Sequence, residues 1–169
     1  MNAASAMMKK SAGLLMFRRS PDAQVQVLLV HPGGPFWAKK DLGAWTIPKG
    51  EYDHSEDALE AAKREFAEET GFPVSGPFFP LGSLKQPSGK TVSVWAFESD
   101  CDPAALISNK FEMEWPPRSG RKASFAEVDR AGWFSLGEAR EKLLKGQAGF
   151  LDALEKEVSR AGGSLGGVR

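Results

Sequence analysis

Short apolar or alternating runs recur along the chain and predict β-strands. They fall at residues 12–18, 25–31, 45–47, 78–86, 91–98 and 110–115. The turn residues Ser20-Pro21-Asp22 separate the first two runs, and Pro87-Ser88-Gly89 separate the fourth from the fifth. Because turn residues between two apolar runs favour chain reversal, each of these pairs predicts an antiparallel hairpin.

Apolar positions with helical spacing alternate with these strands. They predict helices at residues 55–70, 136–145 and 148–158, the first ending at Gly71 with Pro73 just beyond. Paired strands with helices between and after them predict one α/β sandwich domain over residues 1–160, built on a mixed sheet. The Gly-rich end of the chain, residues 161–169, is predicted to be a disordered tail.

Composition adds few constraints to this picture. The chain has 169 residues, of which 41% are hydrophobic, and its 22 basic residues balance 22 acidic ones. A balanced charge gives no long-range attraction for a nucleic acid polymer or an anionic membrane. The single cysteine, Cys101, cannot form an internal disulfide, and no apolar run reaches the roughly 18 to 20 residues of a membrane span. We therefore expect a cytoplasmic protein.

Three glutamates, Glu65, Glu68 and Glu69, crowd the last turn of the first predicted helix. At about 100° per residue, Glu69 lies about 40° from Glu65, at the border of the stripe that carries Ala62 and Phe66. Like charges at this spacing, and carboxylates near a helix C-terminus, are unfavourable by about 0.2 to 1 kcal/mol each. A divalent cation would offset this cost, since carboxylates are hard oxygen ligands. The alternative is a solvated face.

The residues around this helix favour the cation. The fixed positions follow the spacing G-x5-E-x7-R-E-U-x-E-E-x-G-U, in which U is a bulky apolar residue. They are Gly50, Glu56, Arg64, Glu65, Phe66, Glu68, Glu69, Gly71 and Phe72. The segment resembles the Nudix box, and every position is filled. The resemblance implies an α/β/α sandwich with a mixed β-sheet that holds Mg²⁺ or Mn²⁺ against the diphosphate of a nucleotide substrate.

The same resemblance implies roles for individual residues. Glu65, Glu68 and Glu69 would bind the metal together with the carbonyl of Gly50. Glu68 or Glu65 would be the catalytic base of a pyrophosphohydrolase that attacks a nucleoside diphosphate linked to another group. Arg64 would orient a box glutamate. Glu56, near the helix N-terminus, would likewise be structural support.

A further carboxylate outside the box is a metal-ligand candidate. Glu127 stands six residues before Trp133, a spacing that resembles diadenosine tetraphosphate hydrolases. The alternatives are that Glu127 is an ordinary surface residue, or that Glu112 or Glu114 on the alternating strand takes the role.

The stretch from Trp45 to Gly50, WTIPKG, looks like the W-x-x-P-K-G of dinucleoside polyphosphate and diphosphoinositol polyphosphate hydrolases. It makes Trp45 and Lys49 candidate substrate contacts. Cations on the two longest loops could grip a phosphate chain. They are Lys39, Lys40, Arg118, Arg121 and Lys122. Aromatic candidates for stacking on a base are Phe36, Trp37 and Trp115.

Other functions stay open at this stage. The alternatives are a diphosphoinositol polyphosphate hydrolase, an ADP-ribose-type hydrolase and a non-catalytic nucleotide-sensing module, which all share the family's fold. The intact glutamates disfavour the sensing module. The lone histidines His31 and His54 have no partner at ligand spacing, so neither predicts a metal site.

Overall fold

A computed structural model of the chain describes residues 10–161. One sheet of six strands forms its centre. These strands are β1 (Lys10–Arg19), β2 (Val25–Pro32), β3 (Lys49–Tyr52), β4 (Phe79–Lys85), β5 (Thr91–Glu98) and β8 (Val128–Ser135). The helices are α2 (Ala58–Thr70), the short 3-10 helix η1 (Pro103–Ala105), α3 (Leu136–Lys142) and α4 (Gly149–Ala161). A separate hairpin consists of β6 (Lys110–Glu114) and β7 (Lys122–Ala126).

The sheet is mixed, and β1 lies at its centre. Its strand order is β4-β5-β1-β2-β8, with β3 paired to the first part of β1. The pairing of β1 with β5 is parallel, and every other pairing in this sheet is antiparallel. The parallel partners come from distant parts of the sequence, so the sheet joins the two predicted hairpins into one unit.

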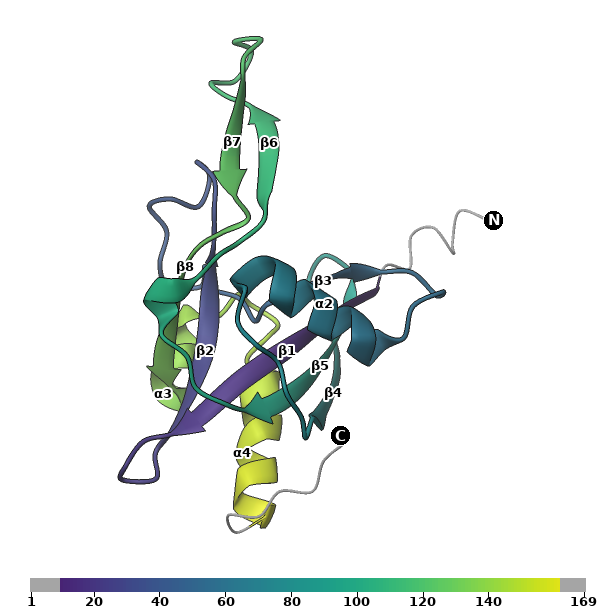
Figure 1. The fold of residues 1–169 in the computed structure, drawn as a ribbon, viewed down its shortest axis with the longest axis vertical. Coiled ribbons are helices and arrows are strands. Elements are labelled where there is room, and N and C mark those ends of the chain that lie inside the picture. Colours follow the sequence, from purple (N-terminus) through teal and green to yellow (C-terminus); the bar gives the residue numbers. More distant parts are fainter. Residues whose placement is uncertain (1–9, 162–169) are drawn as a thin grey trace.

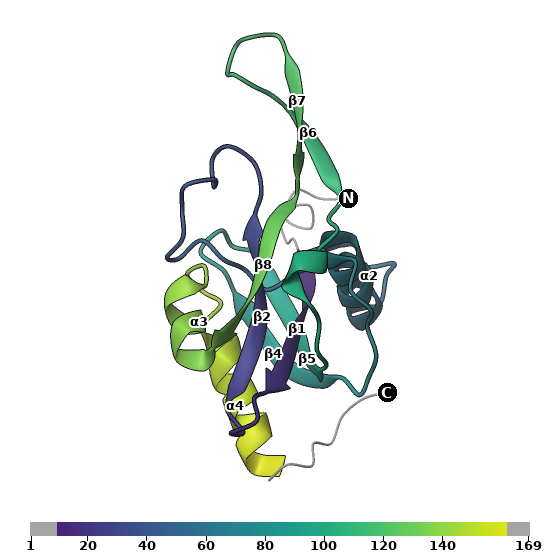
Figure 2. The same cartoon turned by 60° about the vertical axis from the view of Figure 1, so that its left-hand side comes forward.

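Helices cover both faces of the sheet. Helix α2 lies on one face, and α3 and α4 lie on the other (Figures 1 and 2). Side chains alternate along β1, so Leu14 and Met16 pack with Phe66 of α2, whereas Leu15 and Phe17 pack with Leu154 of α4. This confirms the predicted α/β/α sandwich, and the two-sided burial of β1 explains its nearly continuous apolar sequence.

The two predicted hairpins and the three predicted helices are present, with shifted ends. Helix α2 begins at Ala58 rather than residue 55, because the Asp57 side chain accepts a hydrogen bond from the backbone amide of Glu60 and caps the helix. Ser55 instead donates its hydroxyl and its amide to Asp53 in the preceding turn. Helix α3 ends at Lys142, earlier than residue 145.

The strand expected at residues 45–47 is not a regular strand. Thr46 makes an isolated bridge to Val30, and Trp45 makes one to Leu143. Pro48 follows, and the chain becomes regular only in β3, where Gly50 pairs with Ala12 of β1. Proline lacks a backbone donor, which limits the pairing before it.

The loop expected after residue 115 contains a second strand. β7 pairs with β6 in register Phe111 with Phe125, and the hairpin projects away from the main sheet in both views (Figures 1 and 2).

The disordered tail was predicted at residues 161–169, and residues 162–169 lie outside the part of the chain that the structure describes. Within residues 10–161, no helix is long and apolar enough to cross a membrane.

Candidate functional site

The C-terminal turn of α2 has partners for the backbone carbonyls that a helix end leaves free. Gly71 adopts a left-handed conformation (φ 73°), and its amide donates to the carbonyl of Ala67. The amide of Ile107 donates to Thr70 at 3.0 Å, and the amide of Asn109 donates to Glu68 at 2.9 Å. The segment after η1 therefore supplies N–H groups where the helix carries its three acidic side chains.

Two of the three box glutamates point toward the interior. Glu69 is only 8% exposed, and burial, reinforced by the nearby charge of Glu65, raises its pKa to about 8. Burial also raises the pKa of Glu65, although Arg64 opposes that shift. Desolvation favours the protonated form of a carboxyl group, and a positive charge placed nearby would favour the ionised form instead.

Gly50 lies directly against one of these carboxylates. A Cβ built on Gly50 would come within 2.0 Å of the Oε2 atom of Glu65, a distance that no real side chain tolerates. β3 pairs with β1 at this point, and the pairing fixes the backbone beside the helix. The glycine is therefore required by close approach of the strand to the acidic side chain.

Lys49, the neighbour of Gly50, couples β3 to Glu69. Its backbone amide donates a hydrogen bond to the Glu69 carboxylate, and its ammonium group attracts the same carboxylate. Burial lowers the pKa of Lys49, and the charges of Glu69 and Glu65 partly restore it. One residue thus holds a buried carboxylate through the main chain and places a positive charge beside it.

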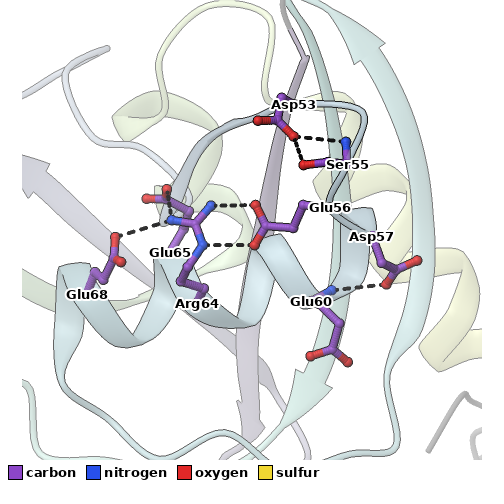
Figure 3. Close-up of polar contacts among 8 residues, drawn as sticks. All are labelled: Asp53, Ser55, Glu56, Asp57, Glu60, Arg64, Glu65 and Glu68. Carbon is purple, nitrogen blue, oxygen red and sulfur yellow. Dashed lines mark hydrogen bonds and ion pairs between the residues drawn. The ribbon is translucent and has the colours of Figure 1, made fainter.

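Arg64 bridges Glu56 to the box glutamates (Figure 3). Its Nε and Nη2 atoms each lie 2.9 Å from an oxygen of Glu56, which is a bidentate pair. Its Nη1 atom lies 2.8 Å from Oε1 of Glu65 and 3.5 Å from Oε2 of Glu68. Arg64 therefore links Glu56 to two of the box glutamates, and the supporting roles of Arg64 and Glu56 stay predictions.

Glu127 lies within electrostatic reach of the box. Its charge contributes to the raised pKa values of both Glu65 and Glu69. Its amide donates to the carbonyl of Asn109 at 2.8 Å, next to the Asn109 amide that caps α2. Glu112 and Glu114, the competing candidates, are exposed on the projecting strand β6, and the Oε1 atom of Glu114 accepts a hydrogen bond from the amide of Arg118. Of the three, Glu127 is the one associated with the box.

The donor set has the chemistry that a divalent cation requires. Among residues 10–161, no three His, Cys, Asp or Glu side chains are already gathered around one point, and the single positive charge of Arg64 offsets only part of the negative charge of Glu65 and Glu68. Four carboxylates nevertheless face this region, and two of them carry raised pKa values. Oxygen donors beside a backbone without a Cβ suit Mg²⁺ or Mn²⁺.

The predicted substrate contacts are placed very differently from one another. Lys49 lies at the carboxylates, as described above. Trp45 is a core residue: it is 6% exposed, packs edge-on against His31 and Phe134, and donates its indole N–H to Asp41. Its large apolar ring therefore supports the loop rather than presenting a face to solvent. Lys39 is exposed on the loop after β2.

Arg121 is exposed near the tip of the β6–β7 hairpin, which extends away from α2 (Figure 2). The strand β7 carries the tip outward, and the sequence pattern did not reveal that strand. Of the aromatic candidates, Phe36 is 61% exposed and stacks edge-on against Trp115, and Trp37 lies under the ammonium group of Lys40.

His31 was expected to have no metal role and proves to be a buried link. It is fully buried, its Nδ1 lies 2.9 Å from a carboxylate oxygen of Asp129, and its Nε2 lies 2.7 Å from the carbonyl of Lys40. It therefore connects the loop after β2 to β8. Its position in an apolar run gave no sign of these two partners.

Comparisons with known proteins agree with this geometry. The sequence model of the NUDIX domain matches residues 7–154. Among curated protein sequences, none matches this chain. A solved structure of the C. elegans Ap4A hydrolase, a binary complex, has a TM-score of 0.63 at 20% identity and covers 90% of this chain and 99% of its own.

Two further solved structures are similar. The NUDIX domain of Shewanella oneidensis NrtR, complexed with ADP ribose, has a TM-score of 0.62 at 17% identity, over 94% of this chain and 99% of that one. The Nudix hydrolase RenU from M. smegmatis has a TM-score of 0.58 at 21% identity, over 89% and 86%. At these identities the likeness shows a shared fold. Since the domain match spans most of the chain and includes the whole segment from Gly50 to Phe72, the chain belongs to the Nudix family.

Proposed function

We propose that the chain is a metal-dependent pyrophosphohydrolase that cleaves a phosphoanhydride bond in a nucleoside diphosphate linked to another group, such as an NTP or a dinucleoside polyphosphate. The carrying observation is the pair of desolvated carboxylates in the last turn of α2: half-buried Glu65, which lies against Gly50, and buried Glu69. A site that keeps acidic side chains desolvated beside a glycine is suited to hold a cation and an anionic substrate together.

The proposed roles follow from what each residue contacts. Glu65, Glu68, Glu69 and Glu127, with the carbonyl of Gly50, would hold Mg²⁺ or Mn²⁺. A divalent ion bound there supplies charge neutralisation at the phosphoryl oxygens and a more acidic water. Arg64 orients Glu65 and Glu68 from one side while Glu56 fixes its guanidinium. Lys49 places an ammonium beside Glu69, where it can meet a phosphate oxygen.

The proposed proton acceptor is Glu68 or Glu65. The Glu68 side chain is 40% exposed, against 13% for Glu65, so water reaches Glu68 more readily. A general base must lie within hydrogen-bond reach of the water that it deprotonates. This difference in access favours Glu68 for proton transfer and leaves Glu65 better suited to hold the metal ion.

The decisive variant is Glu68→Gln, which keeps the shape of the side chain and removes its charge. We expect kcat to fall by about 10²- to 10⁴-fold, the usual contribution of a positioned base, with an unchanged circular dichroism spectrum. Glu60→Gln is the matched control, since Glu60 is exposed on the same helix and its side chain pairs only with Lys63. Equal turnover in both variants would refute the role of Glu68.

The substrate class is tested with a panel of diphosphate compounds incubated with the enzyme and Mg²⁺ or Mn²⁺, followed by identification of the products. We expect release of a nucleoside monophosphate or diphosphate from dinucleoside polyphosphates. A single preference for ADP-ribose would instead favour the alternative represented by the Shewanella domain that binds ADP ribose. Nucleotide binding without any metal-dependent turnover would favour a sensing module.

A further inference from the structure

A cavity lies beside Lys49. Its volume is about 400 Å³, and three segments of the chain supply most of its lining. These are the start of β3, the turn between β4 and β5, and the loop between α3 and α4. None of the residues in the two latter segments was a site candidate from the sequence.

Three lysines line this cavity: Lys49, Lys90 and Lys145. The ammonium of Lys90 lies 2.7 Å from a carboxylate oxygen of Glu51. Within residues 10–161, neither Lys49 nor Lys145 forms an ion pair. Like charges that line one cavity repel one another. An anion placed between them would relieve that repulsion.

The walls of the cavity are held by side chains that bond to the backbone. Gln147 is 1% exposed and accepts a hydrogen bond at 3.0 Å from the amide of Ile47. Gln86 donates through Nε2 to the carbonyl of Gly146 at 3.0 Å. Gly146 has a positive φ of 98°, and a Cβ there would lie 3.0 Å from Gln86. The two loops are therefore fastened together, which keeps the lysines around a defined space.

Lys49 belongs to both this cavity and the carboxylate site. Its backbone amide donates to the Glu69 carboxylate, and the residue also lines the cavity. A phosphate chain that reaches the carboxylates through a metal ion can therefore continue past Lys49 toward Lys90 and Lys145. Lysine ammoniums are compact charges that bind phosphate oxygens without demanding one geometry.

We propose that this three-lysine cavity binds the phosphate chain of the substrate beyond the bond that is cleaved, and that Lys145 is a specificity-determining residue for long phosphate chains. The proposal rests on the proposed pyrophosphohydrolase function and narrows it. It assigns dinucleoside polyphosphates with four or more phosphates as the preferred class, ahead of a nucleotide sugar with only two.

Binding is tested without turnover, so that the result does not depend on the proposed chemistry. Inorganic tripolyphosphate is titrated calorimetrically into the metal-free protein and into Lys145→Gln. Lys145 is exposed on a loop, so this variant leaves the packing unchanged. Lys156→Gln is the control, because Lys156 is an exposed lysine on α4 that does not line the cavity. We expect at least fivefold weaker binding in Lys145→Gln and none of that loss in Lys156→Gln. Equal affinities in both variants would overturn the proposal.

Selectivity is tested by kinetics on the same proteins. For diadenosine penta- or hexaphosphate we expect Lys145→Gln to raise KM by about five- to tenfold with kcat within twofold, while kcat/KM for ADP-ribose stays within twofold. An equal change for long and short substrates would contradict the assignment of the cavity. If no diphosphate compound is hydrolysed but Lys145-dependent tripolyphosphate binding remains, the cavity stands and the proposed hydrolysis fails.

Discussion

At the scale of single residues, the site depends on how closely β3 approaches α2. Gly50 leaves room for the Glu65 carboxylate, and the neighbouring amide of Lys49 holds Glu69. Both contacts are made by the main chain of β3, so their geometry depends on backbone position rather than on flexible side chains. Substitution at position 50 should therefore affect activity before it affects the fold.

Gly50→Ala places a methyl group where Glu65 now lies, within 2.0 Å of its Oε2 atom. We expect the carboxylate to be displaced, metal affinity to fall at least tenfold, and kcat/KM to fall by a similar factor. Binding of Mn²⁺ measured by calorimetry and steady-state kinetics check this. Gly137→Ala is the control, since Gly137 lies in α3 with nothing within 4 Å of its Cβ position. It should be neutral or slightly stabilising.

Glu69 predicts a pH dependence of stability for the metal-free protein. Its pKa of about 8 lies above the usual 4.5, so between these values the unfolded chain has lost a proton that the folded chain keeps. The free energy of unfolding should therefore decrease as pH rises from about 5 to 8. The charged groups that face Glu69 are Glu65, Lys49 and Glu127.

The measurement is urea unfolding in the presence of a chelator at several pH values between 5 and 8.5. Glu69→Gln carries no titrating proton, so its stability should fall less over this range than that of the unaltered protein. Identical slopes in the two proteins would mean that Glu69 is already ionised when the chain is folded.

At the scale of elements, the sequence predicted the strands and helices whose pattern lies within one element or one turn. The alternation in β5, the glycine at the end of α2 and the paired runs of β1 and β2 all lie within one element or one turn, and all are confirmed. β3 was missed because its four residues, with a central glycine, form a strand only by pairing with β1. β7 was missed because a Pro, Gly and Arg-rich segment precedes it.

The residues of the candidate site also fall into two groups, those that a local sequence pattern predicted and those that only the folded chain brings together. The box carboxylates share one helix turn, and helical spacing alone places them near one another. Lys90 and Lys145 stand far from the box in sequence, and no local pattern connects them to it; only the folded chain brings their loops to one cavity. The burial of Trp45 is likewise a tertiary property, since it depends on contacts with His31 and Phe134.

The β6–β7 hairpin is an element whose pairing is internal. It forms its own two-stranded sheet, and the amide of Trp115 donates to the carbonyl of Arg121 at 2.9 Å across the turn. Replacing residues 116–120 with Asn-Gly should close the same strands with a two-residue turn. We expect the Tm to stay within about 2 °C, since none of the removed residues is buried and a loss of about 1 kcal/mol shifts Tm by roughly 2–4 °C.

Differential scanning calorimetry of the shortened protein checks this expectation. The replaced segment includes Arg118 but leaves Arg121 in place, so kinetics on the same variant also test whether the hairpin tip serves the reaction. A large drop in Tm would show that the tip supports the body of the protein.

At the scale of the whole molecule, one strand organises both cores. β1 contributes Leu14 and Met16 to the side covered by α2, and Leu15 and Phe17 to the side covered by α3 and α4. Each fully buried side chain of this size stabilises the fold by about 1.5–3 kcal/mol. Because the acidic site lies where β3 and α2 meet on β1, anything that loosens β1 loosens the site as well.

The parallel pairing of β1 with β5 also bears on how the protein is made. All eight residues from Lys10 to Phe17 pair with Thr91 to Glu98, about eighty positions later in the chain. When the nascent chain has left the ribosome only as far as α2, β5 has not yet been synthesised, so this edge of β1 has no partner strand. Synthesis must pass Glu98 before the sheet can close, so fragments that stop earlier would emerge with an open strand edge that invites aggregation.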